Sequence, residues 1–178
     1  EVTSLPYYSI SEQLLDSCKR MGSQFPNGKP KRLWRRREKG EIHYWREYQR
    51  SGEAAYKQII SIWLSKVRVV HDLAVVPNPF NTEYFAWIDS SFSRTDIDVF
   101  EATVSDGDIA HYGSGMRYLG RQLPLSAGFM VGNENIWRAV SDLVDGEINT
   151  SLKDSYAHDD ETILSRVLAK NSNLFHMI

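Results

Sequence analysis

The stretch Tyr84-Phe85-Ala86-Trp87-Ile88-Asp89-Ser90-Ser91 decides the expected fold. Its first five residues are mostly aromatic or branched and too few for a helix of their own, so we expect a buried strand that ends in a polar loop. In open α/β sheets, ligands bind beyond the carboxyl ends of the strands, and Asp89 would stand at such an end. A carboxylate there can hold a divalent cation, which can in turn hold a diphosphate. The alternative is that Asp89 only caps the following turn.

The length and composition predict one globular domain of ordinary size. The 178 residues can bury a substantial core, and a net charge of −2 with 42% hydrophobic residues is typical of a soluble chain. No apolar run approaches the roughly 20 residues that span a bilayer. The single Cys18 excludes an intrachain disulfide framework and suits a reducing compartment, so we expect a cytoplasmic protein. Because the chain starts at Glu1 rather than Met, we also expect cut ends, and the Golgi lumen is the alternative if an N-terminal anchor has been removed.

A basic segment follows the first expected helix, which spans about residues 9–21. We predict a loop or arm over residues 26–41, in which seven basic residues lie between Lys29 and Lys39. Such a segment can follow a nucleic-acid backbone or hold a phosphate. Because the whole chain is slightly negative, a solvated loop or an arm over an anionic ligand is favoured over a nucleic-acid partner.

A long helix is expected from Glu53 to about Val75, because apolar residues recur there at nearly helical spacing and Pro77 stops the pattern. Lys66 lies one turn beyond Trp63, near the polar edge of the apolar stripe. From that position it can reach a phosphate, or it can simply extend along the stripe into solvent.

A second buried strand is expected over residues 127–133, with Gly128 and Gly132 near its two ends. Gly128 allows close backbone approach, and Gly132 allows the sharp exit that starts a helix at Asn133, which we expect to end near Val144. The amide groups at the start of this helix would suit an anion or a sugar hydroxyl. Weaker patterns predict a strand over 97–104, a turn over 106–108 and a loop over 112–115.

The last helix is expected to begin with an acidic group, His158-Asp159-Asp160-Glu161. Acids in a first turn stabilise a helix by about 0.3–1 kcal/mol each, so Asp160 and Glu161 have a purely structural explanation. That explanation does not require three acids after a histidine. We expect the helix to end at Asn171 or Asn173 and a closing strand to follow over residues 174–178.

The order of these segments resembles the HtrL/YibB family of proposed glycosyltransferases and, more loosely, the nucleotide-diphosphate-sugar transferases of the GT-A fold. The resemblance covers roughly residues 56–178. The motifs that carry it are Trp63-Leu64-Ser65-Lys66, Asn78-Pro79-Phe80, Tyr84-Phe85-Ala86-Trp87-Ile88-Asp89, Ala127-Gly128-Phe129, and Asp160-Glu161 ahead of Leu174-Phe175. It implies an α/β fold with a mixed, mostly parallel sheet flanked by helices. No convincing first strand precedes Tyr56, so we expect the N-terminal nucleotide-binding half to be incomplete or divergent.

The resemblance also implies a site for a nucleotide diphosphate sugar beside Mn²⁺ or Mg²⁺. Asp89 matches the metal-binding acid of the aspartate-any-aspartate motif, and Ser91 replaces its second acid. His176 is then the candidate for a further metal ligand, and Asp160 or Glu161 would bond sugar hydroxyls or accept the acceptor's proton. The predicted substrate contacts are Lys66, Trp87, Ser91, Gly128, Gly132 and Asn133.

The expected function is therefore sugar transfer to a carbohydrate or other hydroxyl acceptor with a divalent cation at Asp89. One alternative is a metal-dependent nuclease or phosphodiesterase, in which Asp89 and the acids at 159–161 share two cations. The other is a catalytically inactive domain of the same fold that binds glycans.

Overall fold

The computed structural model describes residues 1–13, 15–16, 50–90, 107–111, 117–118, 121–122, 124–153 and 160–178. Several predictions fall on other residues and lie outside this part of the chain. These are the basic arm at 26–41, the strand at 97–104, the loop at 112–115, most of the first helix and the site residue Ser91.

The chain divides into two compact units. The first unit contains residues 1–65 and 148–159, and the second contains residues 66–147 and 160–178. In the first unit the 3₁₀ helix η1 spans Val2–Ser4, and the Tyr7 backbone N–H donates a hydrogen bond of 3.4 Å to Ser65 Oγ. The sheet and all of the side chains discussed below as a candidate site belong to the second unit.

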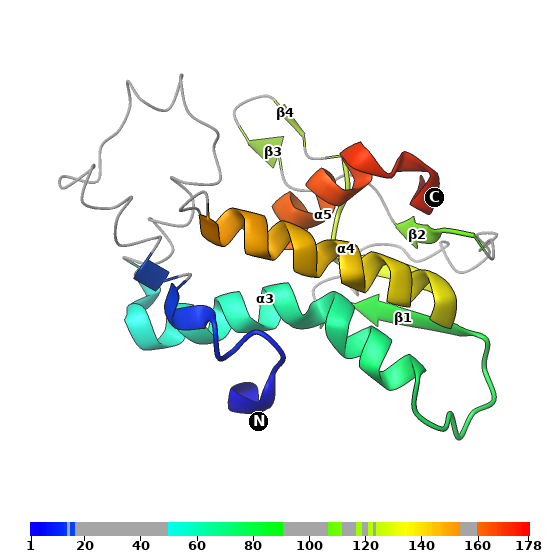
Figure 1. The fold of residues 1–178 in the computed structure, drawn as a ribbon, viewed down its shortest axis with the longest axis horizontal. Helices are drawn as coiled ribbons and strands as arrows, with labels where there is room; N and C mark the ends of the chain where they lie inside the picture. The colour runs from blue at the N-terminus through cyan, green and yellow to red at the C-terminus, as the bar shows by residue number, and fades with distance from the viewer. Residues whose placement is uncertain are drawn as a thin grey trace. The chain divides into compact units, whose positions relative to one another are not determined.

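Helix α3 spans Glu53–Ala74, which confirms the helix predicted from the apolar spacing (Figure 1). Its buried apolar side chains recur every three or four residues, as expected for one face of a helix. They are Tyr56, Ile60, Leu64, Val67, Val70 and Ala74. Lys66 is also buried, at 5% exposure, so it does not extend into solvent.

The second unit contains a four-stranded sheet with the order β1-β5-β2-β6. Its strands are β1 (Tyr84–Ile88), β5 (Phe129–Asn133), β2 (Ile109–His111) and β6 (Phe175–Met177). β5 runs antiparallel to both β1 and β2, and only β2 and β6 pair in parallel. The fold is therefore mixed α/β, as predicted, but the expectation of a mostly parallel sheet is wrong for the described strands.

The reason for this difference is that strand direction is not encoded in the alternation of strands and helices along the chain. Antiparallel and parallel neighbours differ in their hydrogen-bond pattern. The expectation that residues 84–88 form a buried strand is also wrong, because β1 is at an edge of the described sheet, its residues are half-buried or exposed, and Ile88 is 48% exposed. β1 and β5 pair along their whole lengths, from Tyr84 opposite Asn133 to Ile88 opposite Phe129. A separate antiparallel pair consists of β3 (Arg117–Tyr118) and β4 (Arg121–Gln122).

Helix α4 spans Glu134–Lys153 and begins where the sequence predicted a helix start. Asn133 Oδ1 accepts a hydrogen bond of 3.0 Å from the Ile136 backbone N–H, which is an N-cap contact. The predicted end near Val144 is wrong, because buried Ile148 and Ser151 continue the buried face for two further turns. Early in the helix, the fully buried Trp137 donates from Nε1 to the Phe85 carbonyl oxygen at 2.9 Å, which ties α4 to β1.

Helix α5 spans Asp160–Lys170 and is followed by the 3₁₀ helix η5 (Ser172–Leu174) and by β6. The helix start at the acidic group and the closing strand are both confirmed. Ile163, Leu164 and Val167 are buried, so α5 packs through one apolar face.

Gly132 is required by packing in β5, and this gives a stability prediction. A Cβ at Gly132 would lie 2.6 Å from Ile136 Cγ2 and 2.9 Å from Ile109 Cδ1, and both isoleucines are buried. We expect Gly132→Ala to lower the free energy of unfolding by about 1–3 kcal/mol through overpacking, as measured by chemical denaturation.

The matched control is Gly146→Ala in α4. Gly146 is exposed and a Cβ there meets no heavy atom within 4 Å. Alanine is favoured over glycine in a helix, so this variant should be more stable by about 0.4–1 kcal/mol. Equal stability of the two variants would show that the contacts around Gly132 relax without cost.

Candidate functional site

A lysine and two acids from three separate elements meet at the carboxyl end of β1. Lys66 Nζ, from α3, lies 3.0 Å from Asp89 Oδ2, directly after β1, and 2.6 Å from Asp160 Oδ2, at the start of α5. The side chains of Lys66 and Asp160 are 6% and 10% exposed, whereas that of Asp89 is 33% exposed. The structure therefore brings Asp89 to the later acidic group, as the predicted site requires.

Asp89 is held by both of its carboxylate oxygens. Trp87 Nε1 donates to Oδ1 at 2.7 Å, and Lys66 Nζ donates to Oδ2 at 3.0 Å. The Asp89 backbone N–H donates to the Gly128 carbonyl oxygen at 2.8 Å, which extends the pairing of β1 with the residues before β5. The Asp89 side chain thus binds two other side chains, and the turn that it was expected to cap lies outside the described residues from residue 91 on.

Glu161 lies beside this group, next to Asp160 in the first turn of α5. Its Oε1 accepts a hydrogen bond of 3.4 Å from the Ala127 backbone N–H. The Ala127 carbonyl oxygen in turn lies 3.4 Å from Lys66 Nζ and accepts from it. We refer to Lys66, Asp89, Asp160 and Glu161 as the lysine–acid cluster.

The charge on Lys66 is set by two opposing effects. Burial disfavours the charged ammonium, but the nearby carboxylates of Asp160 and then Asp89 outweigh it, so the pKa of Lys66 is raised above its ordinary value. Lys66 is therefore an ammonium at neutral pH. The Trp87 ring adds a further favourable contact, since its centroid lies 5.6 Å from Lys66 Nζ.

The cluster does not fit a ready-made site for the predicted Mn²⁺ or Mg²⁺. The Lys66 ammonium already contacts the two carboxylates that such a cation would bind, and both Asp89 oxygens accept hydrogen bonds. Among the residues that the structure describes, no three His, Cys, Asp or Glu side chains are grouped so as to hold a metal. A divalent cation at Asp89 thus stays a prediction, which these side chains do not support in their present arrangement.

His176 lies in the strand at the opposite edge of the sheet from β1, which leads to Asp89. β6 and β1 form opposite edges of the four-stranded sheet, and neighbouring strands are about 4.8 Å apart. His176 Nδ1 instead lies 2.7 Å from Asp108 Oδ1. The expectation that His176 completes a metal site with Asp89 is therefore wrong, because β6 pairs with β2 and not with β1.

The remaining predicted contacts divide between the cluster and other parts of the unit. A Cβ at Gly128 would lie 3.8 Å from Asp89 Oδ2, so Gly128 does flank the cluster. Gly132 is covered by Ile136 and Ile109 and has a packing role, which corrects its assignment as a substrate contact. Asn133 caps α4 and also lines a separate cavity.

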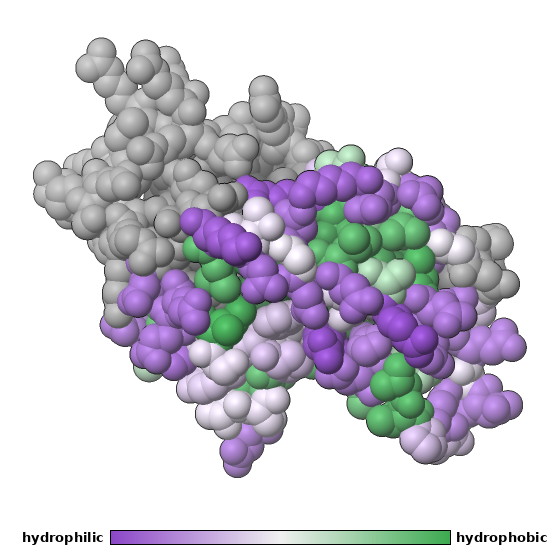
Figure 2. Space-filling model, in the orientation of Figure 1, coloured by the Kyte–Doolittle hydropathy of each residue, from purple (hydrophilic) through white to green (hydrophobic). Residues whose placement is uncertain are grey.

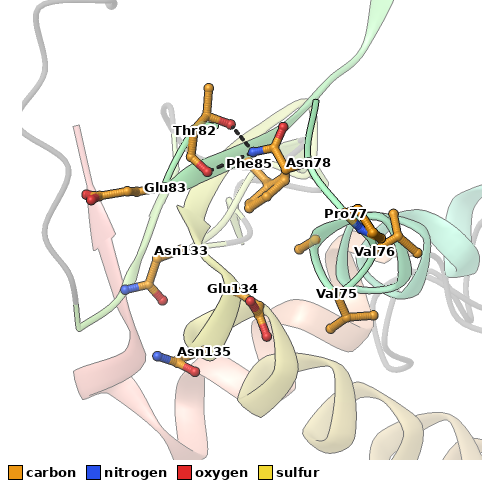
Figure 3. A pocket seen from close by; sticks show the side chains of 11 residues that line it. Val75, Val76, Pro77, Asn78, Thr82, Glu83, Phe85, Asn133, Glu134 and Asn135 are labelled. Carbon is orange, nitrogen blue, oxygen red and sulfur yellow. Dashed lines mark hydrogen bonds between the residues drawn. The ribbon is translucent and has the colours of Figure 1, made fainter. Parts of the chain in front are cut away.

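That cavity, of about 620 Å³, lies at the opposite end of β1 from Asp89. Its walls are the end of α3 with the loop after it, Phe85 of β1, and the start of α4 (Figure 3). Figure 3 shows Asn133, Glu134 and Asn135 along one side and Asn78 on the other, where Asn78 Nδ2 donates to the Thr82 carbonyl oxygen at 2.8 Å. Near this cavity the exposed side chains of Leu73, Val75 and Val76 give an apolar surface where α3 ends (Figure 2).

Two side-chain pairs, one in the cluster and one at the opposite edge of the sheet, were not predicted from the sequence. The bond between Trp87 and Asp89 had a signal, because residues two apart in a strand point to the same face. The pair of His176 with Asp108 had none, since it depends on how β6 joins the sheet.

The described part of the chain is thus mixed α/β, with a partly buried lysine–acid cluster at a strand end. Comparison of the chain with models of protein families, with curated proteins and with solved structures gave no match. Within the described ranges, none of the helices combines the length and apolar character needed to cross a membrane.

Proposed function

We propose that this protein transfers a sugar from a nucleotide diphosphate sugar to a hydroxyl acceptor, and that the lysine–acid cluster binds the sugar part of the donor. We also propose that its mixed α/β fold is a variant of the GT-A type. The observation that carries the proposal is the meeting of Asp89 with Asp160 and Glu161. The resemblance requires these residues, distant in sequence, in one site, and Lys66 Nζ contacts the first two of them directly.

The chemistry of the cluster suits a sugar better than a phosphate. Three carboxylates and one ammonium give the group a net negative charge, which repels a diphosphate. Carboxylates accept hydrogen bonds from hydroxyl groups, and the half-buried Trp87 offers an apolar ring beside them. The countercharge for the diphosphate must then come from residues outside the cluster.

Of the two candidate bases, Glu161 is the better placed to accept the acceptor's proton. Asp160 is 8% exposed, and its Oδ2 already contacts the Lys66 ammonium at 2.6 Å, so this carboxylate is less accessible to an acceptor hydroxyl. Glu161 is only half-buried, and the hydrogen bond that its Oε1 accepts from the Ala127 N–H is long, at 3.4 Å. A general base of this kind contributes by taking the hydroxyl proton as the new glycosidic bond forms.

If this proposal holds, one nucleotide sugar from a panel with different bases and sugars should raise the thermal unfolding temperature of the protein. A ligand that binds only the native state stabilises it by about 2.7 kcal/mol at a concentration 100 times its Kd. Asp89→Asn should weaken this response, whereas Asp72→Asn, an exposed acid at the end of α3, should not. Binding of nucleic acid with a strong salt dependence and no response to any nucleotide sugar would instead favour the phosphodiesterase alternative.

A transfer assay then separates an enzyme from an inactive glycan-binding domain. We expect release of the nucleoside diphosphate from the one donor that stabilises the protein, and faster release when an acceptor is present. Donor binding without any release would exclude the transferase and leave the binding domain.

A further inference from the structure

Lys66 occupies a place that a lysine rarely takes without a specific reason. Lysine is almost never fully buried unless it is paired, because removing an ammonium from water is unfavourable. Lys66 is 5% exposed and emerges from the buried face of α3, between Leu64 and Val67. A hydrophobic residue at this position would suit the core of the helix, so the charge itself needs an explanation.

The surroundings of Lys66 Nζ match an ammonium ion. An ammonium has three N–H donors and no acceptor. Three acceptor oxygens surround it, namely Asp160 Oδ2 at 2.6 Å, Asp89 Oδ2 at 3.0 Å and the Ala127 carbonyl oxygen at 3.4 Å. The Trp87 ring, with its centroid 5.6 Å away, adds the aromatic face that attracts organic cations. All of these groups come from the second unit of the chain.

The same two carboxylates would otherwise form a minimal site for a divalent cation. Mg²⁺ is commonly bound through one or two carboxylates and completes its shell with waters and substrate phosphates. Asp89 and Asp160 both contact one nitrogen, so their oxygens already converge on a single point. To bind there, a divalent cation would have to displace the ammonium, which would leave a buried lysine beside a second positive charge.

We infer that Lys66 is a built-in cation, whose ammonium fills the position between Asp89 and Asp160, beside the acid at which the resemblance places a divalent metal, so that the site binds its sugar ligand without a metal at Asp89. This inference rests on the proposed function for the identity of the ligand. Lys66 acts through its neighbours and is a positioning residue: its ammonium contacts one oxygen of each carboxylate and so fixes their orientation. Asp89, whose side chain is 33% exposed, can then accept hydrogen bonds from sugar hydroxyls.

The inference predicts that removal of the lysine creates a metal site. Thermal unfolding of wild type, Lys66→Met and Lys66→Met/Asp160→Asn should be compared in Mn²⁺ and in EDTA. We expect no difference for wild type, a higher unfolding temperature in Mn²⁺ for Lys66→Met, and loss of that gain in the double variant, which keeps only one of the two carboxylates. A purely structural lysine would give no gain of metal binding in Lys66→Met.

Two results would overturn the inference. One is stabilisation of the wild type by Mn²⁺ that Asp89→Asn abolishes. The other is a folded Lys66→Met that does not respond to Mn²⁺, because the two carboxylates would then not define a cation position.

A second measurement needs no change at Lys66, so it holds even if Lys66→Met does not fold. Binding of the stabilising nucleotide sugar to wild type should be equally tight in EDTA and in Mn²⁺ by calorimetry, and a requirement for Mn²⁺ would contradict the inference. Failure of every nucleotide sugar to bind would count against the proposed function alone, because the Mn²⁺ comparison uses no sugar ligand.

Discussion

Lys66→Met is expected to lower the free energy of unfolding by about 3–5 kcal/mol, because it leaves buried negative charge without its partner. Methionine keeps much of the length and apolar volume of the lysine stem, so the change removes the ammonium and little else. Asp160 is 8% exposed and loses its 2.6 Å contact, and Asp89 loses its 3.0 Å contact. Urea unfolding at neutral pH measures the loss.

Lys57→Met is the matched control on the same helix. Lys57 Nζ lies 3.7 Å from Glu12, whose side chain is 74% exposed. Exposed ion pairs contribute a median of about 0–1 kcal/mol, so this variant should remain close to wild type in stability. If Lys66→Met and Lys57→Met lost equal free energy of unfolding, burial of Lys66 would not be the reason that its ion pairs stabilise the fold.

A double variant separates two effects of Lys66→Met, the loss of the contact with Asp160 and the burial of an unpaired carboxylate. In Lys66→Met/Asp160→Asn the buried carboxylate is also neutralised, and replacing a buried ion pair by neutral groups is often close to neutral in stability. We therefore expect much of the loss in Lys66→Met to be recovered. If the double variant lost as much free energy of unfolding as Lys66→Met and Asp160→Asn lose together, a direct coupling between Lys66 and Asp160 would be contradicted.

The same contact has a defined dependence on pH. The pKa of Lys66 is raised in the folded protein, because the carboxylates of Asp160 and Asp89 outweigh the opposing effect of burial. Its stabilising contribution is therefore complete below the ordinary lysine pKa of about 10.4 and is lost as the pH rises through the higher folded value. The stability difference between wild type and Lys66→Met should narrow over that alkaline range.

The sequence predicted the elements whose signals are local. α3 has a continuous apolar stripe and a proline after its end, and β1 is a short aromatic run closed by Asp89. Both were predicted within a residue of their bounds. β2, at Ile109–His111, has all three residues buried and is too short for any alternation to be seen, so it was not predicted.

The features of the site that could not be predicted from the sequence depend on tertiary packing. A lysine at the edge of an apolar stripe usually reaches solvent, and only the approach of Asp89 and Asp160 makes burial of Lys66 favourable. Likewise, the distance of His176 from Asp89 follows from the pairing of β6 with β2, which no local pattern in residues 174–178 encodes. Strand order and direction thus decided which of the predicted residues meet.

Glu161→Gln is expected to reduce the rate of sugar transfer by about 10²–10⁴-fold, the usual contribution of a general base. The amide keeps the shape of the side chain and its ability to accept from the Ala127 N–H, but it cannot take a proton. The loss should fall on kcat rather than on KM, because binding of the sugar hydroxyls is largely retained. Nucleoside diphosphate release with saturating donor and acceptor measures it.

Glu53→Gln is the control for this effect, because Glu53 is also an acid in the first turn of a helix and is exposed. Each substitution removes one favourable charge from a helix start, which costs about 0.3–1 kcal/mol, so neither variant should unfold. Asp160→Asn should differ from both, since it weakens the contact with Lys66 and lowers stability. The role of base would instead fall to Asp160 if Glu161→Gln kept the full transfer rate and a still folded Asp160→Asn variant lost it. In that case the Lys66 ammonium would have to leave Asp160 during the reaction.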